Sequence, residues 1–409
     1  MPAPRVRPAV AVHGLFVVLG FAVAAFFPFF SIYLQRRGLS ESEIGLVIAS
    51  MAVVRIVSNP VWGHAADARL GRLTALQLSL FGTAVFAFSM NHLSGVVPIA
   101  VGACGIAAFM VATGPNVDTL ALELLGDARM SQYGRIRAWL SLSYAGACLI
   151  IGATLQTKGI TLAMPIFASG SLAVLAWSTT LERDRPRRVA HGRLGTVGAV
   201  FHEAPRFWGF LAAVALLWIG FNAAWNFVGL KIVGAGGGPL LIAIGAALGG
   251  LTEVPVMRLT PRLQARFGLR TVYAVGCVIY ATGFLLWGLI SSPTIVSLLT
   301  IFEGMAFGLL FTTSVVAVGR LLPSHLYSTG NSMTAMVGFG IGPIIGAGLG
   351  GFMYQHLGTT VLYSWASVMA LCGGVVAWFA LDIPALGPRA DIELDAPADV
   401  VVAPPEPLG

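Results

Sequence analysis

The sequence has few charged residues. Lys, Arg, Asp and Glu make up only 10% of the 409 residues, whereas a soluble domain carries about 25%. The mean hydropathy is +0.85. So few charges cannot cover the surface of a 42.8 kDa chain in water. This shortage excludes an ordinary soluble protein and indicates an integral membrane protein.

Cysteine and the motifs of catalysis are also scarce. The four cysteines lie in apolar runs with no CxxC pair and no histidine at metal spacing, so we predict core residues rather than disulfides or metal ligands. The sequence has no nucleophile–base pair and no nucleotide-binding loop, so neither an enzyme nor a bound cofactor is expected. Because the basic residues form no patch interleaved with aromatics, no nucleic-acid partner is expected.

Long apolar runs are abundant. A helix needs about 20 apolar residues to cross a bilayer, and the sequence contains twelve such runs, each predicted to be a transmembrane helix. Pro28, between aromatic pairs in the first run, predicts a kink there. The twelve predicted spans are 9–34, 41–65, 73–93, 96–125, 135–157, 161–181, 206–233, 239–262, 270–291, 294–321, 328–354 and 358–380.

The basic residues indicate how these spans are oriented. With residue 1 in the cytoplasm, 19 of the 24 Lys and Arg residues fall in inside loops or helix ends, 4 fall outside, and Arg55 lies within the second span. Inside loops of membrane proteins are enriched in Lys and Arg. The sequence therefore predicts a multi-pass protein of a bacterial inner membrane with both termini in the cytoplasm.

A polar stretch divides the spans into two sets of six. We predict an N-terminal six-helix bundle at 1–181, a cytoplasmic loop at 182–205, a C-terminal six-helix bundle at 206–381 and a disordered acidic tail at 382–409. Two local matches, at offsets of 197 and 194 residues, indicate duplication: 69–72 with 266–270, and 133–153 with 327–347. Two bundles related by an axis along the membrane normal would enclose a central cavity.

The loop after the second span carries a recognisable motif, GHAADARLGR, which runs from Gly63 to Arg72. Together with the twelve spans and the long middle loop, this motif is similar to that of the major facilitator superfamily, and the chain resembles its members. The stretches 28–45, 53–63, 132–139 and 252–268 narrow the resemblance to the branch of phenylpropionate and lactose permeases. The resemblance implies a fold of two pseudo-symmetric bundles. It also implies a cytoplasmic gate in which Asp67 pairs with Arg72, although one extra residue separates Asp67 from Gly71. The alternative is a solvated loop with a helix cap.

Glu303 is the first candidate for a proton carrier. A charged side chain inside the bilayer costs a few kcal/mol, and burial disfavours the carboxylate anion. The stretch is similar to the tenth helix of the lactose permease, in which a Glu carries the coupled proton. The positions of that permease's His and Lys are occupied here by Thr300 and Ser297, so the polar partners around Glu303 must differ. The alternative is a protonated Glu that hydrogen-bonds a neighbouring helix.

Two further acids, Asp118 and Glu253, are candidates for coupling. For Glu253 the alternative is an ion pair with Arg258. The resemblance implies that Asp118 pairs with Arg137, the residue that matches a substrate-gripping Arg of the lactose permease. It also implies that Tyr144 stacks on the substrate. Arg137 and Tyr144 are seven residues apart and so share a helix face, and a guanidinium can hold a carboxylate or two hydroxyls. The alternative is that Arg137 is one more positive charge on the cytoplasmic side and does not bind the substrate.

The remaining candidates lie in spans two and seven. Arg55 is expected to pair with Asp118 or Glu303, or to line the cavity. Asn222, Trp225 and Asn226 follow the i, i+3, i+4 spacing of one helix face, and are expected to line the cavity, with core packing as the alternative.

These observations lead to a functional expectation. The chain is expected to be a secondary active transporter that moves a small polar or anionic organic solute, such as an aromatic acid, sugar or nucleoside, together with protons by alternating access. The alternative is a proton-coupled drug or metabolite efflux antiporter. Besides solute, protons and lipid no partner is expected, and the chain is expected to be a monomer. A receptor without flux would not need buried carboxylates.

Overall fold

The computed structural model describes residues 8–125, 133–181, 200 and 203–382. The described residues are helical and contain no strand. Most of the predicted middle loop and acidic tail lies outside them. The helices are α1 (Pro8–Ala24), α2 (Phe30–Arg36), α3 (Glu41–Ala65), α4 (Arg72–Ser89), α5 (Val96–Met110), α6 (Thr113–Leu125), α7 (Tyr133–Lys158), α8 (Ala163–Ser178), α10 (Pro205–Gly234), α11 (Pro239–Phe267), α12 (Leu269–Leu289), α13 (Pro293–Leu298), α14 (Thr300–Leu321), α15 (Tyr327–Met336), α16 (Gly342–Leu357) and α17 (Thr359–Ala380).

The predicted all-helical membrane fold is confirmed. Within the described residues, eleven helical segments are long and apolar enough to cross a membrane, and a shorter apolar helix at Val10–Ala24 accounts for the first span. That span, predicted as one helix over 9–34, consists of α1 and α2, which are separated at Pro28 as the kink predicted. Proline lacks the amide hydrogen that a continuous helix would use.

Several other spans are also interrupted. The fourth breaks between α5 and α6, and the tenth breaks at Leu299 between α13 and α14. The eleventh contains a π-helical turn, Val337–Ile341, between α15 and α16. Non-helical backbone at membrane depth is tolerated where protein or water, rather than lipid, surrounds it. These breaks therefore indicate which spans face the interior.

All four cysteines are free, and no disulfide links them. Cys148 and Cys277 are buried, as predicted. The prediction was wrong for Cys372, which is exposed, and Cys104 is only partly buried. An apolar run does not distinguish a residue packed in the core from one that faces lipid.

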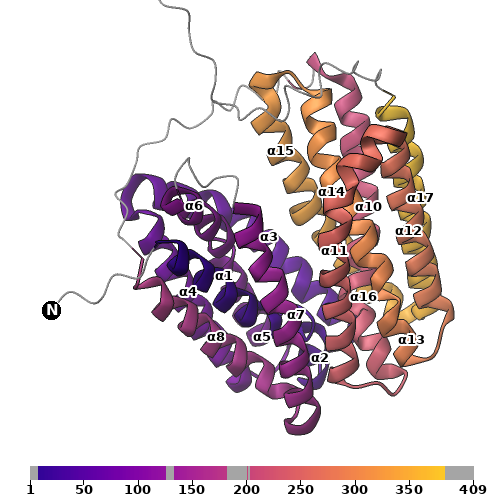
Figure 1. Cartoon of the computed structure of the whole chain (residues 1–409). Helices are drawn as coiled ribbons and strands as arrows, with labels where there is room; N and C mark the ends of the chain where they lie inside the picture. Colours follow the sequence, from indigo (N-terminus) through magenta and orange to yellow (C-terminus); the bar gives the residue numbers. More distant parts are fainter. Residues whose placement is uncertain (1–7, 126–132, 182–199, 201–202, 383–409) are drawn as a thin grey trace, which may run out of the picture.

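The helices form two groups, α1–α8 and α10–α17, which stand side by side in Figure 1. The duplication is visible in the backbone. Six of the glycines with positive φ form pairs 197–199 residues apart, each at a helix boundary: Gly38 with Gly236, Gly71 with Gly268, and Gly159 with Gly358. The two groups therefore repeat the same turns at the same places.

The two groups meet along two helix pairs, α3 with α16 and α7 with α11. Glycines allow the backbones to touch, since a Cβ atom on Gly45 would collide with the carbonyl oxygen of Ala347. The backbone N–H of Ser42 donates to Gln355 Oε1 across this seam at 3.0 Å. We call the end of the molecule that holds this bond the closed end.

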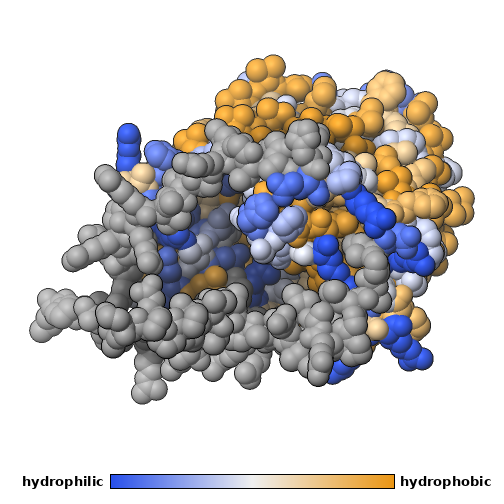
Figure 2. Space-filling model, turned by 90° about the horizontal axis from the view of Figure 1, so that it is seen from above, coloured by the Kyte–Doolittle hydropathy of each residue, from blue (hydrophilic) through white to orange (hydrophobic). Residues whose placement is uncertain are grey.

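At the opposite end, which we call the open end, the groups diverge. Figure 1 shows α6 and α15 far apart there, above the seam. Figure 2 looks onto this end and shows a hollow between the groups with hydrophilic residues on its wall. The fold therefore provides a central space that is accessible from one end.

Candidate functional site

The structure brings Arg137 of α7 and Asp118 of α6 together, with 3.5 Å between Arg137 Nε and Asp118 Oδ1. The two side chains are 57% and 39% exposed, respectively. Because lipid would not solvate these charges, the exposed fraction indicates that the pair faces the hollow between the groups. Exposure also weakens the attraction between the two charges.

Glu253 of α11 extends this cluster across the seam. It lies close enough to Arg137 for the two charges to attract. In the described residues Glu253 forms no ion pair with Arg258, the alternative partner. A guanidinium from one group of helices therefore pairs with an acid of its own group and lies within electrostatic range of an acid of the other.

Glu303 lies one helix further, on α14, and near enough to Glu253 for the two acids to interact. A Cβ atom on Gly249 of α11 would lie 2.8 Å from Glu303 Oε2, so the carboxyl group rests directly against the α11 backbone. Among the described residues Glu303 has no hydrogen bond or ion pair. Glu253 and Glu303 therefore form a pair of neighbouring acids, with Arg137 as the cation that influences Glu253.

Hydroxyl groups fix the packing of the helices around Glu303. Ser297 Oγ donates to the carbonyl oxygen of Leu241 at 2.6 Å, and Thr300 Oγ1 donates to that of Gly245 at 2.8 Å. Ser297 and Thr300 thus bind α13 and α14 to α11. They hold Glu303 in place and carry no charge of their own.

Tyr144 completes the cluster from α7. Its ring lies 3.8 Å from the position of a Cβ atom on Gly250, which places it against α11. Glu253 and Glu303 are both within electrostatic range of its hydroxyl group. Arg137 and Tyr144, two helical turns apart, are therefore both near Glu253.

Arg55 does not join this cluster. It is partly buried on α3 and, in the described part of the chain, forms no ion pair with Asp118 or Glu303. Arg55 was expected either to pair with one of these acids or to line the cavity, and the expected ion pair is not found among the described residues.

The polar face of α10 divides between two environments. Trp225 and Asn226 line a space of about 30 Å³ between the groups, with Pro28 and Ser31 on its other side. Asn222 instead packs against Gly346 of α16. Each amide donates to a backbone carbonyl four residues earlier, Asn222 to Trp218 and Asn226 to Asn222.

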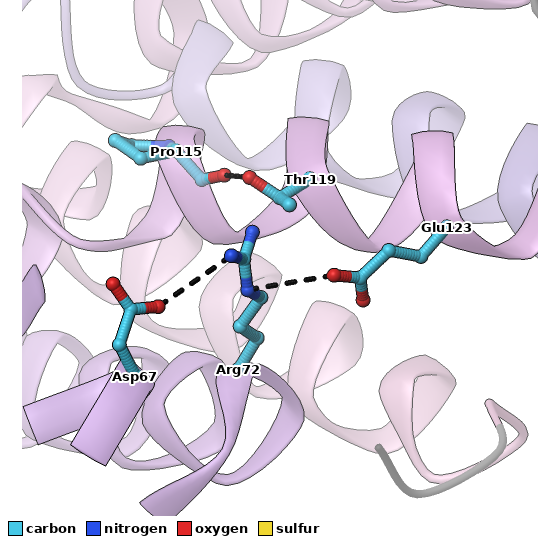
Figure 3. A network of polar contacts seen from close by, with 5 residues as sticks. All are labelled: Asp67, Arg72, Pro115, Thr119 and Glu123. Carbon is cyan, nitrogen blue, oxygen red and sulfur yellow. Dashed lines mark hydrogen bonds and ion pairs between the residues drawn. The ribbon is translucent and has the colours of Figure 1, made fainter. Parts of the chain in front are cut away.

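The motif from Gly63 to Arg72 forms a charged cluster at the open end, shown in Figure 3. Gly71, with φ +76°, ends a π-helical turn and begins α4. Arg72 then points between Asp67 at 3.5 Å and Glu123 of α6 at 3.6 Å. A Cβ atom on Gly63 would meet no heavy atom within 4 Å, so no close contact requires a glycine there.

Sequence reasoning missed two features. The first is the ion pair of Glu123 with Arg72, which Glu123 shares with Asp67; the position of Glu123 near the end of a span gave no indication of this pair. An aromatic cavity of about 260 Å³ lies among α10, α12, α14 and α15. Its residues come from four helices, so no single stretch of sequence predicts it.

Comparisons with known proteins agree with this architecture. A family model described as the MFS_1 like family matches residues 12–365. The maltose permease of Geobacillus stearothermophilus is 28% identical over 88% of this chain and 91% of its own length. A probable 3-phenylpropionic acid transporter of Escherichia coli K12 is 24% identical over 86% of this chain and 91% of its own length.

Solved structures share the fold. A mutant of the nucleoside transporter NupG superposes with a TM-score of 0.81 at 17% identity, covering 91% of this chain and 98% of that one. The peptide transporter POT in complex with sulfate gives a TM-score of 0.73 at 13% identity, covering 91% and 93%. At such identities the likeness concerns the fold alone.

Proposed function

Since the chain belongs to the MFS_1 like family, whose relatives are secondary transporters, we propose that it is a proton-coupled symporter of a small organic solute. Arg137 would hold a carboxylate or paired hydroxyls of the solute, and Glu303 with Glu253 would hold the proton. The chain is a secondary transporter in a membrane. We propose in addition that it couples transport to protons, that it imports its solute, and that these residues have the roles given.

One observation supports the coupling most strongly, namely the line of charges from Asp118 through Arg137 and Glu253 to Glu303. It contains three acids and one base, and it crosses from one group of helices to the other. With all three acids ionised, closing the hollow would bury excess negative charge, which is costly in a bilayer. Protonation of the acids removes that cost, so the carrier can reorient once loaded.

The solute and the proton are linked through Arg137. An anionic solute that binds Arg137 competes with Asp118 and Glu253 for the same guanidinium. Glu253 is then left without its cation and takes up a proton more readily. Solute and proton therefore favour each other's binding, as coupled binding equilibria require.

The distribution of the basic residues predicts which end of the transporter faces the cytoplasm. If both termini are cytoplasmic, as the positive-inside distribution predicts, the closed end faces outward and the open end faces the cytoplasm. The structure then corresponds to an inward-facing carrier, and import ends in this state.

The test is Glu303→Gln in proteoliposomes, with Glu203→Gln, an exposed acid outside the cluster, as the matched control. We expect Glu303→Gln to abolish uptake driven by a pH gradient while counterflow exchange of solute persists. Equal loss of both activities would refute the coupling role. Solute efflux driven by an inward proton gradient would instead identify an antiporter.

A further inference from the structure

Six of the thirteen residues that line the cavity of about 260 Å³ in the second group of helices are aromatic. Trp218 lies at its centre, with ring centroids 4.7 Å from Phe339, 5.2 Å from Phe221 and 6.1 Å from Phe307. Phe311 stacks on Phe307 at 5.5 Å. The cavity is therefore an aromatic box built by α10, α12, α14 and the eleventh span, and we call it the aromatic cavity.

Few polar groups face the aromatic cavity. Of its thirteen lining residues, Ser314, Asn331 and Thr334 carry the aliphatic hydroxyl and amide groups, together with the phenol of Tyr280 and the indole of Trp218. A sugar that entered would leave most of its hydroxyls without partners, at a cost of about 1–3 kcal/mol for each. An apolar group would lose nothing and would be removed from water.

The size of the aromatic cavity suits a ring with a short chain. A closed apolar cavity of about 150 Å³ is large enough to bind benzene, and this one is larger. Ala335 and Phe311 are exposed members of its wall, so the cavity has an opening.

The aromatic cavity adjoins the charged cluster, because Phe307 of its wall lies four residues, or about one helical turn, after Glu303 on α14. Tyr280 lines the cavity and is also within electrostatic range of Glu253 and Glu303. Asn331, which the internal repeat aligns with Arg137, is on the cavity wall. The two halves of the transporter thus offer different chemistry at matching positions, a guanidinium in one and an uncharged aromatic box in the other.

We propose that the aromatic cavity holds the apolar, ring-bearing part of the solute while Arg137 holds its carboxylate. The substrate class is then a small carboxylic acid with an aromatic body, and not a sugar. This inference rests on the proposed function for the role of Arg137, but it concerns binding and does not require proton coupling.

The test is calorimetric titration of the purified full chain in detergent, without any gradient. The probes are 3-phenylpropionate, propionate and maltose. The variant is Ala335→Trp, which fills the cavity, and its control is Ala212→Trp, an exposed position of α10 away from the cavity. Phe339→Ala, which removes a wall ring, is the second variant in case the first does not fold.

We expect 3-phenylpropionate to bind at least about tenfold more tightly than propionate, because its ring is removed from water. Ala335→Trp and Phe339→Ala should each weaken that binding by about tenfold, and Ala212→Trp should not. Binding of maltose in preference to the acid, binding unaffected by both cavity variants, or no binding of 3-phenylpropionate would overturn the inference. Normal binding without pH-driven uptake would instead overturn the proton coupling alone.

Discussion

The closed end depends on a glycine contact that a single methyl group should break. A Cβ atom on Gly351 of α16 would lie 3.0 Å from the Cα atom of Gly45 on α3, and closer still to the carbonyl oxygen of Glu41. Ordinary contacts of a Cβ atom begin at 3.4 Å. The obstructing atoms are backbone and cannot rotate away, so Gly351→Ala must push the two groups of helices apart at this end.

The size of the effect follows from the packing. Forcing an extra methyl group into a close-packed contact costs about 1–3 kcal/mol. The strain exists only while the end is closed, because opening separates α3 from α16. Gly351→Ala should therefore shift the equilibrium toward opening of this end by about 5- to 150-fold.

Pulsed electron paramagnetic resonance can measure this shift. Spin labels at Arg36 and His356, which are exposed on opposite sides of the closed end, would report the separation of the groups once the native cysteines are replaced. Gly348→Ala is the matched control, since it lies on the same helix and its Cβ atom would meet nothing within 4 Å.

We expect Gly351→Ala to populate longer distances than the parent protein, and Gly348→Ala to leave the distribution unchanged. Identical distributions for the two variants would show that the contact does not hold the end closed. The control also accounts for the higher helix propensity of alanine, which both variants share.

Other predictions concern the seam and the charged residues. Gly152→Ala places a methyl group against Ala243 across the α7–α11 seam, and should open the closed end as Gly351→Ala does, whereas Gly146→Ala, with no atom within 4 Å, should not. Arg137→Lys should reduce uptake of anionic solutes by about tenfold or more in flux assays, because the two parallel N–H donors are lost. An equal fall for neutral solutes would contradict this. Arg72→Ala removes the ion pairs with Asp67 and Glu123. It should lower the free energy of unfolding by only about 1 kcal/mol, since both ion pairs are partly exposed. A loss several times larger would refute that estimate.

The helix count could be predicted from sequence because lipid imposes length and hydrophobicity on every span. Pro28 likewise predicted the break in the first span, since its missing N–H acts locally. The break at Leu299 had no such cause. It arises where Ser297 and Thr300 bond to α11 carbonyls, and those partners lie some 55 residues away in the chain.

The charged residues of the site could be found individually because each is exceptional inside a span. The resemblance also implied the pairing of Asp118 with Arg137, but the connections to Glu253 and Glu303 could not be predicted, since these depend on how the two groups of helices dock. In the described residues, Arg137 pairs with Asp118 of its own group, and Glu253 of the other group is near enough for the two charges to attract. Arg258, five residues from Glu253, was the simpler partner by sequence, but no ion pair joins them in the described residues.

In the proposed mechanism, Arg137 and Glu303 share one water-filled space that is open at one end. The direct measurement is the reaction of Arg137→Cys and Glu303→Cys, in a cysteine-free background, with a membrane-impermeant thiol reagent added on either side of sealed vesicles. We predict that reagent on the side of the open end modifies both, and that Ile301→Cys, exposed on the same helix as Glu303, stays unmodified. Modification of neither position, or equal modification of Ile301→Cys, would contradict a shared central cavity.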